Sequence, residues 1–177
     1  MSDLSERIAE RVISIPDYPR KGVIFRDIMP IAADAELFHD IIAELAARHT
    51  GERIDRVVAI ESRGFVFGGA LANELKCGFT PIRKAGKLPR ETIRETYQLE
   101  YGEGTIELQK DALAPGARVI LVDDLLATGG TVNAAIRLIQ RLGAEVTAAD
   151  FVIELGFLSP RSNIRGCSRI HTLLTYD

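Results

Sequence analysis

The stretch 118–131 reads RVILVDDLLATGGT, an apolar run followed by two adjacent aspartates and a loop of small residues. Residues 119–122 are continuously apolar and β-favouring, which is typical of a strand buried on both faces of a parallel sheet. We expect the chain to leave the sheet at Asp123. From Thr131 onward apolar residues recur at helical spacing and Gly143 is a stop signal, so a helix is predicted over 130–142.

The loop 127–131 therefore lies at a predicted helix N-terminus, which favours a bound phosphate. The first backbone N–H groups of a helix have no intrahelical partner, and the helix dipole adds partial positive charge beside them. Glycines without Cβ let a phosphate approach the backbone, and threonine hydroxyls add donors. A helix cap followed by a simple turn uses the same residue types, so the loop alone leaves that alternative open.

The paired Asp123 and Asp124 favour a ligand site. Neighbouring carboxylates repel each other, so a cation or sugar hydroxyl groups are expected between them. The carboxyl edge of an open α/β sheet is also where ligands bind. Two common nucleotide motifs do not fit, because no lysine follows Gly130 as in a P-loop and the turn lacks G-x-G-x-x-G. The stretch thus predicts a site for a phosphorylated, polyhydroxylated ligand.

Composition indicates a single globular domain over 1–177, with 46% hydrophobic and 27% charged residues. The net charge of −3 argues against general nucleic-acid binding. The amino terminus has no apolar signal core, and no apolar run reaches the roughly 18 residues of a membrane span. Cys77 and Cys167 lack metal-type spacing and are expected to be ordinary thiols. We expect a cytoplasmic protein that binds neither nucleic acid nor membranes.

Hydrophobic periodicity predicts an α/β fold with a mostly parallel twisted sheet and helices on both faces. An amphipathic helix is predicted over 2–14, ended by Pro16, and Asp34 is expected to cap a second helix. The segments 56–60, 64–76 and 79–83 form a β-α-β unit, and 118–122, 130–142 and 144–153 form another.

Between these units, residues 84–109 are rich in charge and in glycine and proline. Alternation at 97–100 and 105–109 predicts a two-stranded excursion with a mobile tip. Inserted segments of this length in compact domains are often functional lids.

Two further clusters at predicted strand ends favour a second anion site. The turn 61–64 contains Ser62 and Arg63, which offer backbone N–H groups and a guanidinium. Arg83, Lys84 and Lys87 follow the next strand, where a solvated basic face is the ordinary explanation. Because all of these residues leave the sheet at the same edge as the acidic pair, contact with a pyrophosphate is the better interpretation.

Several strings occur together in order: VIFRD at 23–27, ESRGF at 61–65, RKAGKLP at 83–89, LEYG at 99–102 and DDLLATGGT at 123–131. Together they resemble the adenine phosphoribosyltransferases of the type I phosphoribosyltransferase family over residues 10–155. The tail from Gly156 onward matches less well. The resemblance implies the type I fold, with a small hood in the N-terminal segment 1–33, a flexible two-stranded flap at 84–109 and a phosphoribosyl pyrophosphate (PRPP) loop region at 118–131.

The resemblance also implies an activity, conversion of adenine and PRPP to AMP and pyrophosphate in purine salvage. Adenine N9 would attack C1 of a ribose with oxocarbenium character. Mg²⁺ is implied as the cofactor, held mainly by PRPP and water rather than by protein ligands. A homodimer is the usual assembly. The open alternatives are a phosphoribosyltransferase for another purine or pyrimidine base and a non-catalytic PRPP-sensing regulator.

Site roles follow from the same resemblance. The PRPP-binding residues would be Asp123, Asp124, Ala127, Thr128, Gly129, Gly130 and Thr131. The pyrophosphate would be held by Ser62, Arg63, Lys84, Lys87 and Tyr101. Adenine would be bound by Ile24, Phe25, Arg26 and Leu155, with Phe25 and Leu155 on opposite faces of the base. Glu100 would accept the purine proton, and Arg63 would be the second catalytic residue.

Overall fold

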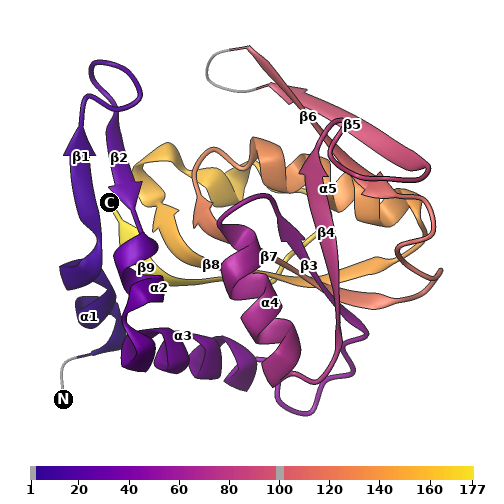
Figure 1. The fold of residues 1–177 in the computed structure, drawn as a ribbon, viewed down its shortest axis with the longest axis horizontal. Helices are drawn as coiled ribbons and strands as arrows, with labels where there is room; N and C mark the ends of the chain where they lie inside the picture. The colour runs from indigo at the N-terminus through magenta and orange to yellow at the C-terminus, as the bar shows by residue number, and fades with distance from the viewer. Residues whose placement is uncertain (1–2, 99–101) are drawn as a thin grey trace.

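The computed structural model describes residues 3–98 and 102–177, which form a central sheet of seven strands in the order β5-β6-β4-β3-β7-β8-β9 (Figure 1). Neighbouring strands in the β4-β3-β7-β8-β9 part are all parallel, whereas β6 pairs antiparallel with both β4 and β5. The strands are β3 (Arg56–Ile60), β4 (Gly78–Lys84), β5 (Thr92–Gln98), β6 (Glu103–Gln109), β7 (Arg118–Leu126), β8 (Glu145–Leu155) and β9 (Ile170–Tyr176). The predicted mostly parallel α/β sheet is therefore confirmed.

Helices cover both faces of the sheet, because strand residues alternate between two hydrophobic clusters. The helices are α1 (Leu4–Arg11), α2 (Met29–Ala33), α3 (Ala35–Ala47), α4 (Gly64–Glu74) and α5 (Gly130–Arg141), with 3-10 turns η1 (Gly156–Leu158) and η2 (Pro160–Ser162). In β3, Val58 and Ile60 pack with α5, whereas Val57 and Ala59 pack with the helices α1 to α4. As predicted, the Asp34 side chain caps α3 by accepting the Leu37 amide.

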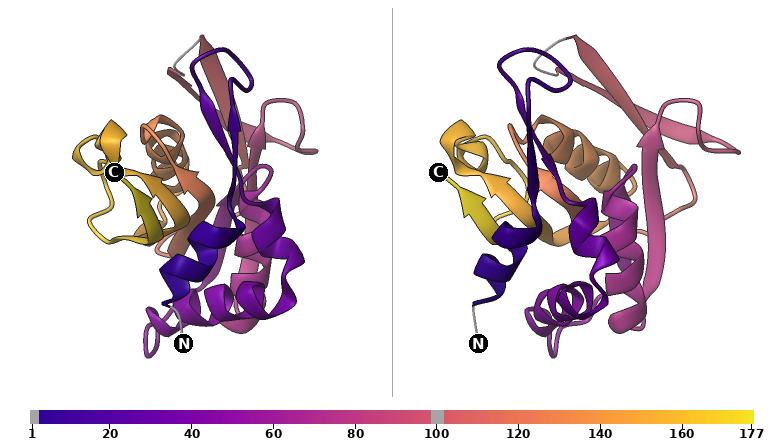
Figure 2. Two further views of the ribbon diagram at one scale, coloured as in Figure 1. Left: turned by 90° about the vertical axis from the view of Figure 1, so that its left-hand side faces the viewer. Right: turned by 60° about the vertical axis from the view of Figure 1, so that its left-hand side comes forward.

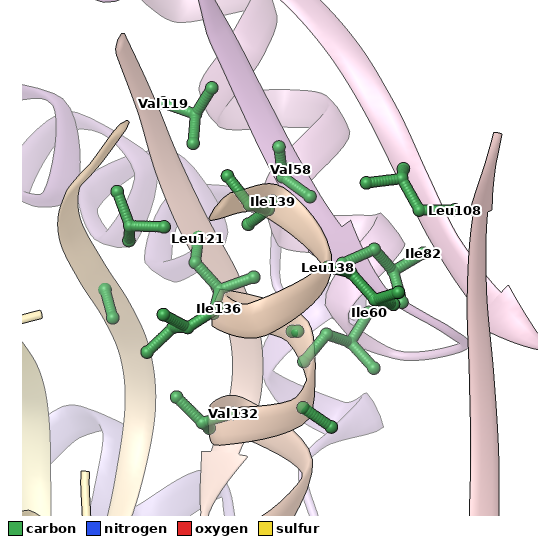
Figure 3. Packing of buried hydrophobic residues seen from close by; sticks show 14 of the residues in the cluster. Val58, Ile60, Ile82, Leu108, Val119, Leu121, Val132, Ile136, Leu138 and Ile139 are labelled. Atoms are coloured by element: carbon green, nitrogen blue, oxygen red, sulfur yellow. The ribbon is translucent and has the colours of Figure 1, made fainter. Parts of the chain in front are cut away.

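The helix α5 fixes the loop that precedes it, because its apolar side buries deeply against the sheet. Val132, Ile136, Leu138 and Ile139 pack against residues of β3, β4 and β7 (Figure 3). Fully burying one such side chain contributes about 1.5–3 kcal/mol. The start of α5 is therefore held at a set position beside the end of β7.

The strand β7 is longer than the sequence predicted. The expectation that the chain leaves the sheet at Asp123 is wrong, because β7 runs to Leu126 and pairs with β8 as far as Glu154. The cause is the length of β8, which offers a backbone partner beyond the apolar run. Asp123 and Asp124 consequently lie within β7, where Asp123 pairs with Phe151 of β8, rather than on a loop.

The N-terminal segment differs from its prediction as well. The helix α1 ends at Arg11 rather than near Pro16, and Ile13–Pro16 forms β1, which pairs antiparallel with β2 (Ile24–Asp27). The β-branched Val12, Ile13 and Ile15 favour the strand once a partner strand is present. Figure 2 shows this hairpin and the β5–β6 hairpin at the same end of the molecule.

The β5–β6 excursion is confirmed, but it continues the main sheet rather than standing apart. Arg83 and Lys84 of β4 pair with Glu107 and Ile106 of β6. The first flap strand covers Thr92–Gln98 and is longer than predicted. Residues 99–101 lie outside the described part of the chain, so the predicted mobile tip stays a prediction.

A buried polar cluster joins the turn after α3 to the strands β8 and β9. The Asp150 carboxylate lies 2.6 Å from His49 Nε2 and 2.9 Å from His171 Nδ1. His49 Nδ1 is buried without a hydrogen-bond partner among the described residues, so the ring proton belongs on Nε2, where it is donated to Asp150. Two imidazoles and one carboxylate are not the oxygen ligand set that Mg²⁺ prefers, so this cluster does not suit the Mg²⁺ implied for the reaction.

Replacing Asp150 by asparagine should lower the free energy of unfolding by about 3 kcal/mol at neutral pH, because both imidazoles lose the carboxylate they face. Urea unfolding measures this. The matched control is Asp111→Asn, which breaks an exposed pair with Arg90 and should cost less than about 1 kcal/mol.

Comparing the unmodified protein with Asp150→Asn also tests the role of Asp150 in acid stability. Burial raises the pKa of Asp150, but hydrogen bonds from His171 and His49 outweigh it and lower the pKa below its ordinary value. A carboxyl with a lowered folded-state pKa stabilises fully above its unfolded pKa, near about 4, and loses that contribution as pH falls through the folded value. The unmodified protein should therefore lose more stability on acidification than Asp150→Asn. Equal losses would contradict this role.

None of the helices in the described ranges 3–98 and 102–177 is long and apolar enough to cross a membrane.

Candidate active site

A cleft of about 290 Å³ opens at the carboxyl ends of the parallel strands. Its walls come from the ends of β3, β4 and β7, the first turn of α5 and the flap strands. They are Ile60, Glu61, Ser62, Arg63, Lys84, Tyr97, Ile106, Asp123, Asp124, Leu125 and Thr131. The structure thus brings the acidic pair, the turn after β3 and one of the predicted lysines into a single cleft.

The acidic pair is held by hydrogen bonds on both members. Arg63 Nε donates to Asp124 Oδ2 at 2.5 Å, and the Asp124 amide donates to Asp123 Oδ1 at 2.9 Å. Burial raises the pKa of Asp123 well above its ordinary value, and the neighbouring Asp124 charge raises it further. The cleft therefore favours a ligand that brings positive charge or hydroxyl donors to this carboxyl.

Gly64 lets α4 approach β7 closely. A Cβ on Gly64 would lie 2.6 Å from Asp123 Oδ1 and 3.2 Å from the Asp123 Cα. Both contacts are closer than a side-chain carbon tolerates. The glycine in the ESRG string is thus a packing requirement of the acidic pair, in addition to any contact with an anion.

Arg63 also connects the acidic pair to the hood. Its guanidinium carbon lies 5.2 Å from the ring centroid of Phe25. Phe25 in turn makes an edge contact with Tyr18 at 5.2 Å between ring centroids. Arg63, predicted to contact pyrophosphate, is therefore already engaged by a carboxylate and lies near an aromatic ring.

Glu61 is a functional residue that the sequence reasoning missed. Its carboxylate accepts Arg83 Nε at 3.1 Å and the Lys84 amide at 3.0 Å. Burial opposes ionisation, but these hydrogen bonds outweigh it and lower the pKa of Glu61. Glu61 neutralises Arg83 and fixes the end of β4, and Lys84 consequently reaches the cleft. The sequence signal for this role was the position of Glu61 directly before Ser62 and Arg63, which were predicted to bind an anion.

Lys87 belongs to a neighbouring loop rather than to the cleft wall. Its amide and that of Leu88 each donate to Glu107 Oε1 at 3.0 Å. Glu107 is buried and also accepts Thr92 and Arg94 from β5. This carboxylate, likewise missed, joins the loop after β4 to both flap strands.

The phosphate loop has the predicted placement at a helix N-terminus. Gly129 is the N-cap of α5 with φ +85°, a conformation that favours glycine, and no side chain within 3–98 and 102–177 caps the helix. The first N–H groups of α5 are therefore left for an anion. Thr131 lines the cleft and Thr128 is exposed, with Ala127 before it at the end of β7.

The predicted base pocket is only partly assembled. Ile24, Arg26 and Leu155 line a second cavity of about 400 Å³ with Gly22, Val23, Phe157 and Leu158. Phe25 is absent from that lining, because neighbouring strand residues face opposite sides, and it lies near Arg63 instead. Arg26 stacks on the Tyr176 ring at 4.2 Å.

Tyr97 was also missed by the sequence reasoning. It lies on β5 and lines the main cleft. Tyr97 lies two residues after Glu95 on the flap strand, and this alternating pattern was the sequence signal that its side chain lies on one face of the strand. Glu100 and Tyr101, predicted for proton transfer and pyrophosphate contact, lie outside the described residues.

Comparison with known proteins identifies the family. A model of the phosphoribosyl transferase domain matches residues 33–156. An adenine phosphoribosyltransferase from Anaeromyxobacter dehalogenans (strain 2CP-C) is 49% identical over 173 residues, covering 98% of this chain and all of that protein. The chain belongs to the adenine phosphoribosyltransferases.

Solved adenine phosphoribosyltransferases share the whole fold. The Thermoanaerobacter pseudethanolicus structure has a TM-score of 0.92 and 45% identity, covering 97% of this chain and 99% of that one. The Saccharomyces cerevisiae structure, complexed with D-2,5-dideoxy-2,5-imino-altritol 1,6-bisphosphate and adenine, has a TM-score of 0.90 and 40% identity, covering 97% and 98%. The hood, the flap and the sheet thus belong to a common adenine phosphoribosyltransferase architecture.

The close approach at Gly64 yields a prediction. Gly64→Ala should lower the free energy of unfolding by about 1–3 kcal/mol, because the added methyl group meets Asp123. Gly69→Ala in the same helix is the control, since a Cβ there meets no atom of the described residues within 4 Å and should stabilise the helix by about 0.5–1 kcal/mol. Urea unfolding compares the two variants, and equal effects would show that the Asp123 contact is unimportant.

Proposed function

We propose that this protein transfers the phosphoribosyl group of PRPP to adenine, giving AMP and pyrophosphate. The observation that carries the proposal is the placement of a hydrogen-bonded acidic pair beside the uncapped N-terminus of α5 in one cleft. The full-length similarity to adenine phosphoribosyltransferases supports the choice of base.

The sugar half of the substrate would occupy the end of β7. The 5-phosphate would bind the loop of Ala127, Thr128, Gly129, Gly130 and Thr131, where the α5 dipole and its free N–H groups favour an anion. Asp123 and Asp124 would accept hydrogen bonds from the ribose hydroxyls. Their negative charge would also stabilise the oxocarbenium character that develops at C1.

The pyrophosphate half would lie toward the turn after β3. Ser62, Arg63 and Lys84 line that side of the cleft and supply the donors. Lys87 and Tyr101 remain proposals for the same group, Lys87 from the loop that Glu107 holds. The carboxylates of the cleft are hard oxygen donors that suit Mg²⁺ and its bound water. When bound with PRPP, Mg²⁺ would neutralise charge on the leaving pyrophosphate.

Adenine would be read by the backbone of the hood strand β2. An amide N–H and C=O pair at Ile24 and Arg26 matches adenine N1 and N6, whereas hypoxanthine inverts that pattern. Leu155 lies with these residues in the second cavity. Phe25 would contact the base from the side of the main cleft, which its nearness to Arg63 supports.

Glu100 would accept the proton from the purine. The backbone of the flap supports this role, because the Gln98 carbonyl lies 3.2 Å from the place a Cβ on Gly130 would take. The chain therefore runs directly over the phosphate loop two residues before Glu100. A flap over the cleft would also exclude water and protect PRPP from hydrolysis.

Two finer proposals concern the setting. A homodimer is supported by exposed apolar side chains on α4 and β4, where Val66 and Phe79 are each more than a third exposed. Sedimentation at several concentrations tests it, and a monomer throughout would refute it.

A cytoplasmic location is supported by the free cysteines Cys77 and Cys167.

The activity has a direct test. Purified protein with PRPP, Mg²⁺ and adenine should form AMP and pyrophosphate, measured by chromatography. Hypoxanthine, guanine and pyrimidine bases should turn over at least about 100-fold less efficiently. Preference for another base would replace adenine in the proposal, and PRPP binding without turnover would favour a sensor.

Two substitutions separate chemistry from binding. Glu100→Ala should lower kcat by about 100-fold or more with a smaller change in PRPP affinity, because a general base acts in the transition state. Asp124→Asn should instead raise the KM for PRPP, because it removes the charge that faces the ribose. Unchanged kinetics in Glu100→Ala would remove that residue from the mechanism.

A further inference from the structure

The chain after η1 packs against the phosphate loop, which gives the weakly matching tail a place in the site. We call residues 160–165 the tail turn. A Cβ on Gly129 would lie 3.3 Å from Ile164 Cγ1 and 3.4 Å from the Pro160 carbonyl oxygen. The tail turn therefore covers the residue whose φ of +85° sets the start of α5.

Asn133, in the first turn of α5, uses both ends of its side-chain amide on the tail turn. Its Nδ2 donates to the Asn163 carbonyl at 2.9 Å, and its Oδ1 accepts the Arg165 amide at 2.9 Å. The Asn133 amide also closes the first turn of α5 onto the Gly129 carbonyl at 2.9 Å. Asn163 Nδ2 adds a longer contact of 3.4 Å to the Thr128 carbonyl.

The tail turn is itself firmly anchored. Ile164 is buried in the cluster that contains Val132 and Ile136 of α5. Arg161 forms a two-pronged ion pair with the buried Glu154 at 2.7–3.0 Å and donates to the Ile170 carbonyl at 2.9 Å. The tail turn is therefore tied to β8 and β9, and through Asn133 the same anchor reaches the phosphate loop.

We propose that the tail turn is a clamp that holds the phosphate loop 127–131 in its anion-binding conformation, with Asn133 as the positioning residue. The inference rests on the proposed function, because it assigns the 5-phosphate of PRPP to that loop. Asn133 acts through backbone groups of the loop and the tail. A preset loop binds its anion without the entropic cost of ordering it, so the clamp contributes to phosphate affinity.

The experiment measures which ligand loses affinity. Asn133→Ala should raise the KM for PRPP and the calorimetric Kd for ribose 5-phosphate by about tenfold each. The KM for adenine, the Kd for pyrophosphate and kcat should stay within about twofold. Asn133→Asp should be at least as impaired, because it keeps the acceptor for Arg165 but places a carboxylate oxygen against the Asn163 carbonyl.

Two controls bracket the effect. Gln140→Ala alters the other end of the same packing, where a Cβ on Gly166 would lie 2.7 Å from Gln140 Nε2, and should leave the ribose 5-phosphate affinity unchanged. Asn163→Ala removes only the long contact to Thr128 and should have an intermediate effect.

The outcomes are distinct. Unchanged ribose 5-phosphate affinity in Asn133→Ala would overturn the clamp. An equal loss of affinity for ribose 5-phosphate, adenine and pyrophosphate would also overturn it, because that result indicates general destabilisation. If the unmodified protein forms no AMP, the proposed function fails, whereas the ribose 5-phosphate titration still tests the clamp. If Asn133→Ala does not fold, Asn163→Ala decides, and wild-type affinity in that variant would overturn the clamp.

Discussion

Repulsion between two neighbouring carboxylates at the end of β7 is the constraint around which the cleft is organised. Asp123 and Asp124 both lie within β7, where Asp123 pairs with Phe151 of β8, so the strand limits how far the two carboxylates can move apart. Arg63 donates to the Asp124 carboxylate, and the Asp124 amide donates to the Asp123 carboxylate. Burial and the neighbouring Asp124 charge also raise the pKa of Asp123. Such a site would suit the ligand proposed for it, which brings hydroxyl donors and a cation.

A second layer of carboxylates sets the cationic side of the cleft. Glu61 accepts the amide of Lys84 at the end of β4, and Glu107 accepts the amides of Lys87 and Leu88 in the loop that follows, so both carboxylates connect segments of the backbone. Glu61 also pairs with Arg83, and Glu107 pairs with Arg94, so the charge of each arginine is neutralised by a carboxylate. A count of basic residues near 83–94 therefore overstates the charge available to an anion.

The sequence predicted what depends on local pattern. Periodicity identified the helix α5, the buried strands and the capping role of Asp34, and the motif strings identified the family. Contacts between distant segments could not be predicted from local pattern. The strand β7 extends because β8 is long, β1 forms because β2 offers a partner, and Phe25 lies near Arg63 rather than among the residues that line the cavity with Leu155. The tail turn had no motif of its own, since its bond to Asn133 joins residues about thirty positions apart.

Arg63 contacts both the acidic pair and the aromatic ring of Phe25. Its bond to Asp124 is short and partly buried, and removing the guanidinium would leave two carboxylates with less compensation. Arg63 therefore holds the acidic pair, and the pyrophosphate proposed for this side of the cleft would compete with Asp124 for the guanidinium. The same guanidinium lies 5.2 Å from the Phe25 ring centroid, so a ligand that drew it from Asp124 would also change its contact with Phe25. Arg63 thus connects the acidic pair at the end of β7 to the aromatic side chain of β2.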